Sequence, residues 1–166
     1  MRLHRKVITL AICALAFSPA LASAQQTVPF QGTWTGVTTA ADLSGFPVVD
    51  IIADGAGSFS HLGASTMVSP HTTNVLTGET LGDQVFTSAN GDQLTAYCAG
   101  FPMPTPDGSV VGTLQCSVTS GTGRFEGATG SYTFALVAVP QGIGYATTAE
   151  INGSISTVGS SRGRGK

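Results

Sequence analysis

Apolar and polar residues alternate along several segments of this chain. Between residues 110 and 118 every second position is apolar or small, and the positions between them are mostly polar. The same period of two runs from Tyr145 to Ile155, where Ile151 and Ile155 share a row with Tyr145 while Glu150 and Asn152 fall in the other row. Side chains of a β-strand alternate between two faces, so this pattern predicts strands with one dry and one wet face. No segment shows the 3.6-residue apolar period of an amphipathic helix.

Short β-rich runs separated by Gly, Pro, Asn and Asp recur at even spacing, which is typical of all-β domains. Asn90-Gly91 predicts a type I′ hairpin, and Pro106-Asp107-Gly108 predicts another reversal. We expect a single antiparallel β-barrel of about eight strands, because closure removes exposed sheet edges. The predicted strands are Phe30–Thr39, Pro47–Ala53, Ser58–Val68, Thr72–Leu76, Gln84–Ser88, Gln93–Ala99, Ser109–Thr119, Ser131–Val139 and Tyr145–Ile155.

The first 24 residues have the order of a cleavable signal peptide. Arg2, Arg5 and Lys6 precede the uncharged apolar run 7–17, and Ala22-Ser23-Ala24 supplies a small-x-small cleavage site. The apolar run is too short for a stable membrane span, and Ile12 before Cys13 argues against a lipid anchor. We therefore expect a secreted or periplasmic protein without stable membrane insertion. Its parts are a signal peptide (1–24), a barrel domain (25–155) and a disordered basic Gly/Ser tail (156–166).

Charge excludes one class of partner. Arg124 is the only Lys or Arg between residues 25 and 155, a segment that holds all nine Asp and Glu residues of the chain. An acidic body repels phosphates, so we expect no nucleic-acid binding. An outer-membrane barrel is also disfavoured, because aromatic residues are few and no aromatic girdle is visible. The pattern does not predict the oligomeric state.

Cys98 and Cys116 are the only cysteines after the signal peptide. In an oxidising compartment a disulfide is the default for such a pair. The two positions are centred on Asp107 of the predicted turn, so they lie opposite each other if the flanking strands pair. Both also share a face with apolar residues. A catalytic thiol is the alternative, but no charged residue adjoins either cysteine. We predict the disulfide Cys98–Cys116.

Candidate chemistry is sparse. Two histidines follow the signal peptide, His61 and His71, and their spacing does not suit a metal site. No Gly-x-Ser-x-Gly elbow is present, and the glycine-rich segment 121–130 lacks the phosphate-loop pattern. The sequence therefore predicts no metal and no cofactor. If the protein is an enzyme, His61 and Glu126 are the first candidates for an acid or base.

Four segments together resemble a known family. They are Phe30-Gln31-Gly32-Thr33-Trp34-Thr35-Gly36, Ser60-His61-Leu62-Gly63, the segment from Ser88 to Leu94 and the segment from Thr122 to Ser131. In this order they resemble secreted bacterial proteins with an allene oxide cyclase barrel-like domain. The resemblance implies an eight-stranded barrel with an apolar interior. The plant enzyme cyclises an unstable fatty-acid epoxide without a cofactor, but its catalytic residues have no matched positions in this chain.

A second resemblance rests on Gly32-Thr33-Trp34, which is similar to the Gly-x-Trp at the start of lipocalins and avidins in the calycin superfamily. In those proteins the Trp lies at the barrel base and packs against an Arg. The resemblance implies a cation–π stack between Trp34 and Arg124, whereas a surface carboxylate is the alternative partner for Arg124.

Three functions remain open. The leading prediction is an exported barrel that binds a small apolar ligand without catalysis. The second is a cofactor-independent cyclase- or isomerase-like enzyme that acts on a lipid-derived substrate. The third is a structural or surface protein with a filled barrel, since an eight-stranded barrel is just wide enough to be packed solid or to hold one small ligand.

Overall fold

The structure, a computed structural model, describes residues 26–156. The expected signal peptide (1–24) and residues 157–166 of the expected tail lie outside the described residues. Ser156, expected to begin the tail, is instead the last residue of a strand. Among the described residues, no helix is long and apolar enough to cross a bilayer.

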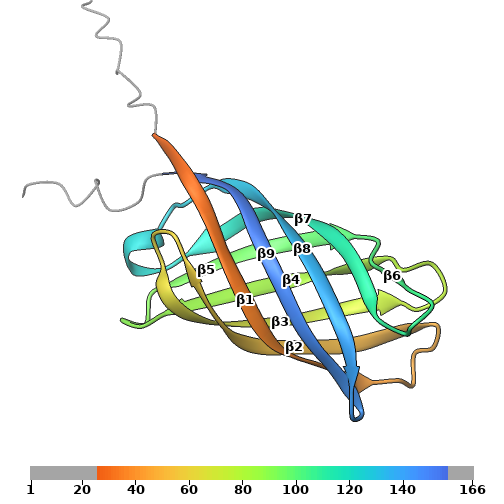
Figure 1. Cartoon of the computed structure of the whole chain (residues 1–166). Helices are drawn as coiled ribbons and strands as arrows, with labels where there is room; N and C mark the ends of the chain where they lie inside the picture. The colour runs from red at the N-terminus through yellow and green to blue at the C-terminus, as the bar shows by residue number, and fades with distance from the viewer. Residues whose placement is uncertain (1–25, 157–166) are drawn as a thin grey trace, which may run out of the picture.

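The described residues form a closed antiparallel β-barrel, which confirms the all-β prediction (Figure 1). From β1 to β5 and from β7 to β9 each strand pairs with the next along the chain, β1 pairs with β9, and β5 pairs with β7 to close an eight-stranded ring. The remaining strand, β6, is a two-residue extension that pairs with β7. The strands are β1 (Thr27–Asp42), β2 (Val48–Phe59), β3 (Gly63–Asn74), β4 (Thr80–Ser88), β5 (Gln93–Gly100), β6 (Met103–Pro104), β7 (Val110–Gly121), β8 (Gly130–Gln141) and β9 (Gly144–Ser156), with one 3-10 turn, η1 (Gly123–Phe125).

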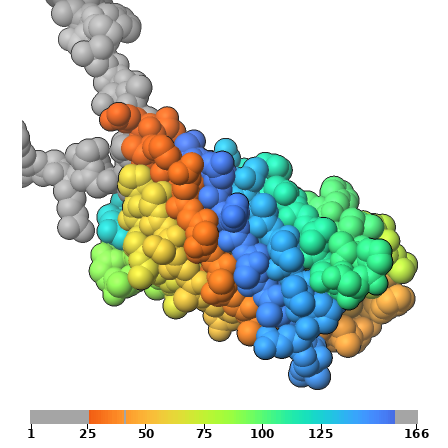
Figure 2. Space-filling model, in the orientation of Figure 1, coloured from red at the N-terminus to blue at the C-terminus, as the bar shows by residue number. Residues whose placement is uncertain are grey.

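The predicted alternation sets the inner face of the barrel. On β7 Leu114 and Cys116 are buried while Gln115 between them is exposed. On β9 Ala149 and Ile151 are buried while Glu150 between them is exposed. One-residue alternation of this kind is what a wall with a dry inside and a wet outside requires. Figure 2 shows the strands as oblique stripes across the outer wall.

Several predicted strands have the wrong boundaries. Pro47–Ala53 stops short of the end of β2 at Phe59, and two others include residues that lie in turns. The predicted strand Ser58–Val68 spans the turn between β2 and β3, where His61 has a φ of 67° and Gly63 a φ of 73°. The backbone N–H of Ser60 still donates to the carbonyl of Gln31 at 2.7 Å, in line with the β1–β2 register, and the chain reverses just after it. The predicted strand Thr72–Leu76 is the end of β3 followed by a loop. The side chain of Asn74 accepts the N–H of Leu76 at 3.0 Å, which replaces a strand hydrogen bond.

The Asn90-Gly91 hairpin is confirmed, but its turn is not type I′. Gly91 has a φ of 87°, and among the described non-glycine residues only His61 has a positive φ, so Asn90 does not. The side chain of Asn90 instead accepts the hydroxyl of Ser88 at 2.6 Å and the N–H of Asp92 at 3.3 Å. A side chain that organises the turn in this way removes the need for a second left-handed residue.

The predicted disulfide is confirmed. Cys98 of β5 and Cys116 of β7 are register partners, with Cα atoms 4.1 Å apart and their sulfurs bonded. Both side chains are buried on the inner face. The bond links the two strands that close the barrel, and the chain between them carries β6 as well as the predicted turn.

One half of the barrel is filled. Phe30, Phe59, Phe86 and Tyr132 pack against one another there, with ring centroids 5.0–6.2 Å apart. Phe125 of η1 is fully buried in the same cluster. Both ends of the described chain also lie at this end, because Thr27 is the register partner of Ser156 (Figure 1). We call it the closed end.

Candidate functional site

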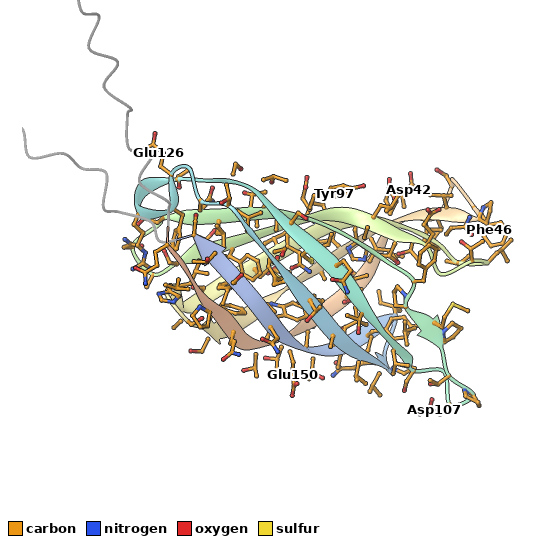
Figure 3. All side chains as sticks on the ribbon, turned by 90° about the horizontal axis from the view of Figure 1, so that it is seen from above. Asp42, Phe46, Tyr97, Asp107, Glu126 and Glu150 are labelled. Atoms are coloured by element: carbon orange, nitrogen blue, oxygen red, sulfur yellow. A yellow bond between two sulfur atoms is a disulfide. The ribbon has the colours of Figure 1, made fainter. Side chains whose placement is uncertain are left out.

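The other half of the barrel encloses a cavity of about 420 Å³. Its opening, which we call the mouth, lies among the loops after β1, β3, β5 and β8, at the opposite end from Glu126 (Figure 3). This volume is within the range of sites that hold small organic molecules. The lining side chains used below are Trp34, Thr38, Leu43, Ser69, His71, Thr73, Val75, Thr80, Gln84, Leu114, Phe134, Leu136, Ala138, Ile143, Tyr145 and Thr147.

The size of the inward side chains explains why this half is hollow. Near the mouth the inner positions include Thr38 on β1, Ser69 on β3, Ala138 on β8 and Thr147 on β9, where the closed end has phenylalanines. Trp34 and Phe134 line the deeper part, with ring centroids 6.1 Å apart. The same period-two pattern therefore yields a packed core at one end and a cavity at the other.

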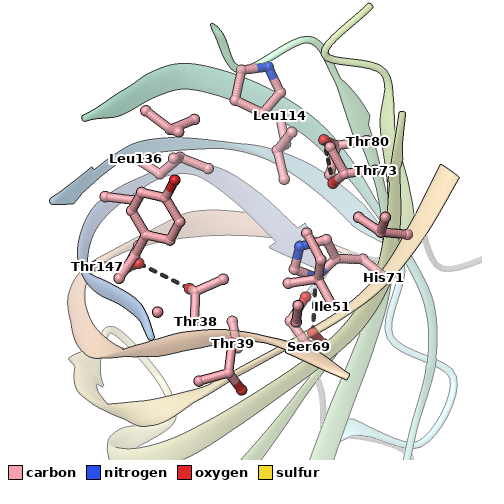
Figure 4. Close-up of a pocket in the computed structure, with 18 of the residues that line it drawn as sticks. Thr38, Thr39, Ile51, Ser69, His71, Thr73, Thr80, Leu114, Leu136 and Thr147 are labelled. Atoms are coloured by element: carbon pink, nitrogen blue, oxygen red, sulfur yellow. Dashed lines mark hydrogen bonds between the residues drawn. The ribbon is translucent and has the colours of Figure 1, made fainter. Parts of the chain in front are cut away.

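Most cavity hydroxyls are already paired. Thr38 and Thr147 lie 2.8 Å apart through their hydroxyls, and Thr73 and Thr80 lie 3.0 Å apart (Figure 4). The hydroxyl of Thr80 also contacts the carbonyl of Gly78 at 3.2 Å. A hydroxyl that already has a hydrogen-bond partner does not need one from a ligand. These threonines therefore contribute mainly apolar surface to the cavity.

His71 projects from β3 into the cavity (Figure 4). Its Nδ1 lies 2.9 Å from the backbone carbonyl of Ser69, which can only accept, so Nδ1 carries the proton. Burial lowers the pKa of His71 below its usual 6.5, although this hydrogen bond opposes the effect, and the ring is neutral at pH 7. The Nε2 atom of this tautomer is an acceptor, and no described residue hydrogen-bonds to it.

Gln84 is a buried polar residue in the wall of the cavity. Its Oε1 accepts the hydroxyl of Tyr132 at 2.8 Å, and the Tyr132 oxygen also lies 4.0 Å from the sulfur of Cys98. Burial raises the pKa of Tyr132, so the phenol keeps its proton and remains a donor. This contact fixes the amide with Oε1 toward Tyr132, and no described residue accepts a hydrogen bond from Nε2.

Trp34 is nearly fully buried, and its indole N–H has no hydrogen-bond partner among the described residues. The ring lies over Gly36, where an added Cβ would come within 2.3 Å of the indole. Gly36 therefore leaves the space in which the tryptophan lies flat along β1.

The cavity carries no formal charge. Its lining contains no Asp, Glu, Lys or Arg, and His71 and Tyr145 are its titratable side chains. In the part of the chain that the structure describes, no group of three or more His, Cys, Asp or Glu residues could hold a metal ion. An ion would lose its hydration here without gaining a counter-charge, so the arrangement suits a neutral molecule.

The two candidate acid–base residues from the sequence lie outside the cavity. His61 is exposed in the turn between β2 and β3, and Glu126 is exposed just after η1 at the closed end (Figure 3). Neither lines the cavity.

The structure does not bring Trp34 and Arg124 together. The guanidinium carbon of Arg124 lies 4.9 Å from the ring centroid of Phe125, and NH2 donates to the carbonyl of Leu62 at 3.2 Å. Its Nε is 3.7 Å from the carboxylate of Asp92. Trp34 contacts Phe134 instead. Arg124 thus fastens η1 to the turn after β2 and to the β4–β5 hairpin.

Sequence reasoning missed His71 and Gln84 as site residues. Their inward direction follows from alternation with buried neighbours, Ser69 on β3 and Phe86 on β4. The same strand pattern does not tell which end of the barrel is open, and only that decides whether an inward polar residue meets a cavity or a packed core.

Large apolar side chains surround the mouth. Leu43, Phe46, Leu76 and Phe101 are each more than three-fifths exposed, and Ile143 is fully exposed. They come from the loops after β1, β3, β5 and β8. Leu43 and Ile143 also line the cavity, so its apolar surface continues outward onto the mouth.

No protein-family model matches the chain, and no curated protein matches its sequence. Among solved structures, a pterocarpan synthase dirigent protein is similar with a TM-score of 0.55 and 13% sequence identity. The similarity covers 89% of this chain and 99% of that protein's chain. At this identity it shows a shared barrel fold and nothing about activity.

Proposed function

We propose that this protein binds one small, uncharged and largely apolar molecule in the cavity, without catalysis. The observation that carries the proposal is the cavity of about 420 Å³ inside an otherwise well-packed barrel. Interiors are normally filled to close packing, and an unfilled space of this size costs stability unless something occupies it. The hollow half also weighs against a structural protein with a filled barrel.

The disulfide supports an exported protein, secreted or periplasmic, because such bonds persist in oxidising compartments. A water-filled compartment is a place where an apolar molecule needs a carrier or a sequestering protein. The scarcity of basic residues supports the inference that the barrel binds no nucleic acid.

A cofactor-independent cyclase- or isomerase-like activity on a lipid-derived substrate is the second candidate. The observation in its favour is His71, a neutral imidazole with an acceptor nitrogen facing the cavity. Such a group serves as a general base when its partner is positioned against it. The resemblance to allene oxide cyclase barrel-like proteins and the synthase name of the structural neighbour point the same way.

Native mass spectrometry of protein purified from its source tests the proposal. We expect a bound mass of a few hundred daltons in the wild type. Ala138→Phe, whose new ring projects into the cavity, should lose that mass. Val139→Phe is the matched control, since Val139 is half-exposed on the outer face of the same strand, and it should keep the mass.

Two results would contradict the proposal. One is wild-type protein that neither carries a bound molecule nor takes up neutral apolar probes. The other is Ala138→Phe protein that is folded by circular dichroism and binds as well as the control. Turnover of a bound molecule into an isomer, lost in His71→Phe, would favour the second candidate.

A further inference from the structure

Two polar side-chain atoms on the neighbouring strands β3 and β4 face the cavity without a hydrogen-bond partner among the described residues. Nε2 of His71 is an acceptor with no donor among the described residues, and Nε2 of Gln84 is a donor with no acceptor among them. Both side chains are held by their other polar atom, His71 through the carbonyl of Ser69 and Gln84 through the hydroxyl of Tyr132. Buried polar groups are nearly always paired in native proteins, so unpaired ones in a cavity wall indicate a ligand that pairs with them.

The two atoms belong to neighbouring positions of the wall. His71 of β3 is the register partner of Gly82 on β4, and Gln84 is the next inward residue along β4. Diagonal neighbours of this kind have Cβ atoms about 7 Å apart, so one functional group of a ligand reaches both side chains. Gly82 makes the arrangement possible, because a Cβ there would lie 2.4 Å from the Cβ of His71.

The opposite wall offers no polar partner of this kind. β8 is four strands from β3 around the ring, and together with β7 it presents Leu114, Phe134, Leu136 and Ala138 to the cavity. A bound molecule is therefore held by contacts of two kinds. Its polar edge faces β3 and β4, and its apolar body lies against β7 and β8.

Building on the proposed function, we infer that the ligand is a neutral apolar molecule with a hydroxyl group. The hydroxyl donates to Nε2 of His71 and accepts from Nε2 of Gln84. A hydroxyl is the smallest group that does both. A carboxylate is excluded by the uncharged lining, and an ether or a ketone leaves the imidazole unpaired.

Competition for a neutral fluorescent probe tests this inference. N-phenyl-1-naphthylamine is bound to the whole protein and displaced by 1-octanol, by 1-methoxyheptane or by octanoate. The alcohol and the ether have the same number of heavy atoms, but only the alcohol donates. We expect the alcohol to bind roughly tenfold more tightly than the ether, the effect of one buried hydrogen bond, and octanoate to compete weakest.

Three variants assign the effect to the two side chains. In His71→Phe the alcohol and the ether should bind within about twofold of each other. In Gln84→Met both should weaken by a similar factor, because both oxygens accept. Thr72→Val is the matched control, since Thr72 lies on β3 beside His71 but does not line the cavity, and it should keep the tenfold preference. Circular dichroism and thermal melting confirm that each variant is folded.

The outcomes separate the two proposals. If the wild type binds neither the probe nor any competitor, the cavity is not a binding site and the proposed function fails together with this inference. If the wild type binds the alcohol and the ether equally, or if His71→Phe keeps the preference, the proposed function stands and the hydroxyl assignment is wrong.

Discussion

His71 couples the stability of the barrel to pH. Burial lowers its folded-state pKa below 6.5, whereas the unfolded chain titrates near 6.5. As the pH falls through this region, the unfolded state takes up the proton more readily than the folded state. The free energy of unfolding therefore decreases from about pH 6.5 down to the lowered pKa of the folded protein.

We predict that His71→Phe flattens this part of the pH profile. The measurement is urea denaturation of the wild type and the variant at pH 7 and pH 5. Asp42 and Asp107 also have lowered pKa values, but from 3.8, so they act at lower pH and equally in both proteins. An identical loss of stability between pH 7 and pH 5 in the two proteins would show that the imidazole is not responsible.

At the scale of elements, the sequence predicted the strands through their period of two and missed turns that side chains create. The Asn90-Gly91 hairpin was predicted, because its glycine can adopt the positive φ that Gly91 has. Val75 and Leu76 have strand-forming side chains, yet they lie in a loop because Asn74 accepts the N–H of Leu76. The strand propensities of single residues do not include this competition between a side-chain hydrogen bond and the backbone hydrogen bonds of a sheet.

The candidate site was less predictable than the strands. The sequence indicated an apolar interior and correctly paired Cys98 with Cys116, because both are consequences of alternation and compartment. The sequence suggests His61 and Glu126 as acid–base candidates, but it does not show which loops meet at which end of the barrel. His71 lines the cavity and His61 does not. This difference depends on the register of β3 with β4 and on which half of the barrel is open, and both are long-range properties.

The disulfide stabilises the pair of strands that closes the ring. Its cysteines are 18 residues apart, and a bridge over such a loop contributes about 3 kcal/mol by restricting the unfolded chain. We predict that the double variant Cys98→Ala, Cys116→Ala loses about this much stability in urea denaturation while keeping its β-sheet circular dichroism. Loss of the bond should not open the ring, because six other register pairs between Leu94 and Gly100 still join β5 to β7.

Free thiols offer an independent check on that bond. Thiol titration of the denatured, unreduced exported protein should find no reactive cysteine. Two reactive thiols per chain, or a double variant as stable as the wild type, would contradict the stabilising role of the bridge.

At the scale of the whole molecule, the barrel divides its core unequally. Aromatic rings fill the closed end, and the mouth-side half holds the cavity. A ligand that binds only the folded state adds stability by mass action, about 2.7 kcal/mol when its concentration is 100 times its dissociation constant. A ligand added to the protein should therefore bind in the cavity and raise the melting temperature.

We predict that saturating 1-octanol raises the melting temperature of the wild type and of Val139→Phe by several degrees. Ala138→Phe should melt at the same temperature with and without the alcohol, because its ring occupies the binding space. Differential scanning calorimetry measures all three. An equal rise in the three proteins would mean that the alcohol acts elsewhere than in the cavity.

The pairing of Thr27 with Ser156 has a practical consequence for handling this protein. Both ends of the barrel chain leave at the end opposite the mouth. A linker that joins either end to a solid support therefore presents the mouth to solution. The same proximity permits a circular permutant, in which a short peptide joins residues 27 and 156 and new ends are cut in the β8–β9 turn beside Gly142. Such a permutant would place an affinity tag or a fluorescent reporter directly at the cavity entrance, where ligand entry could be followed in real time.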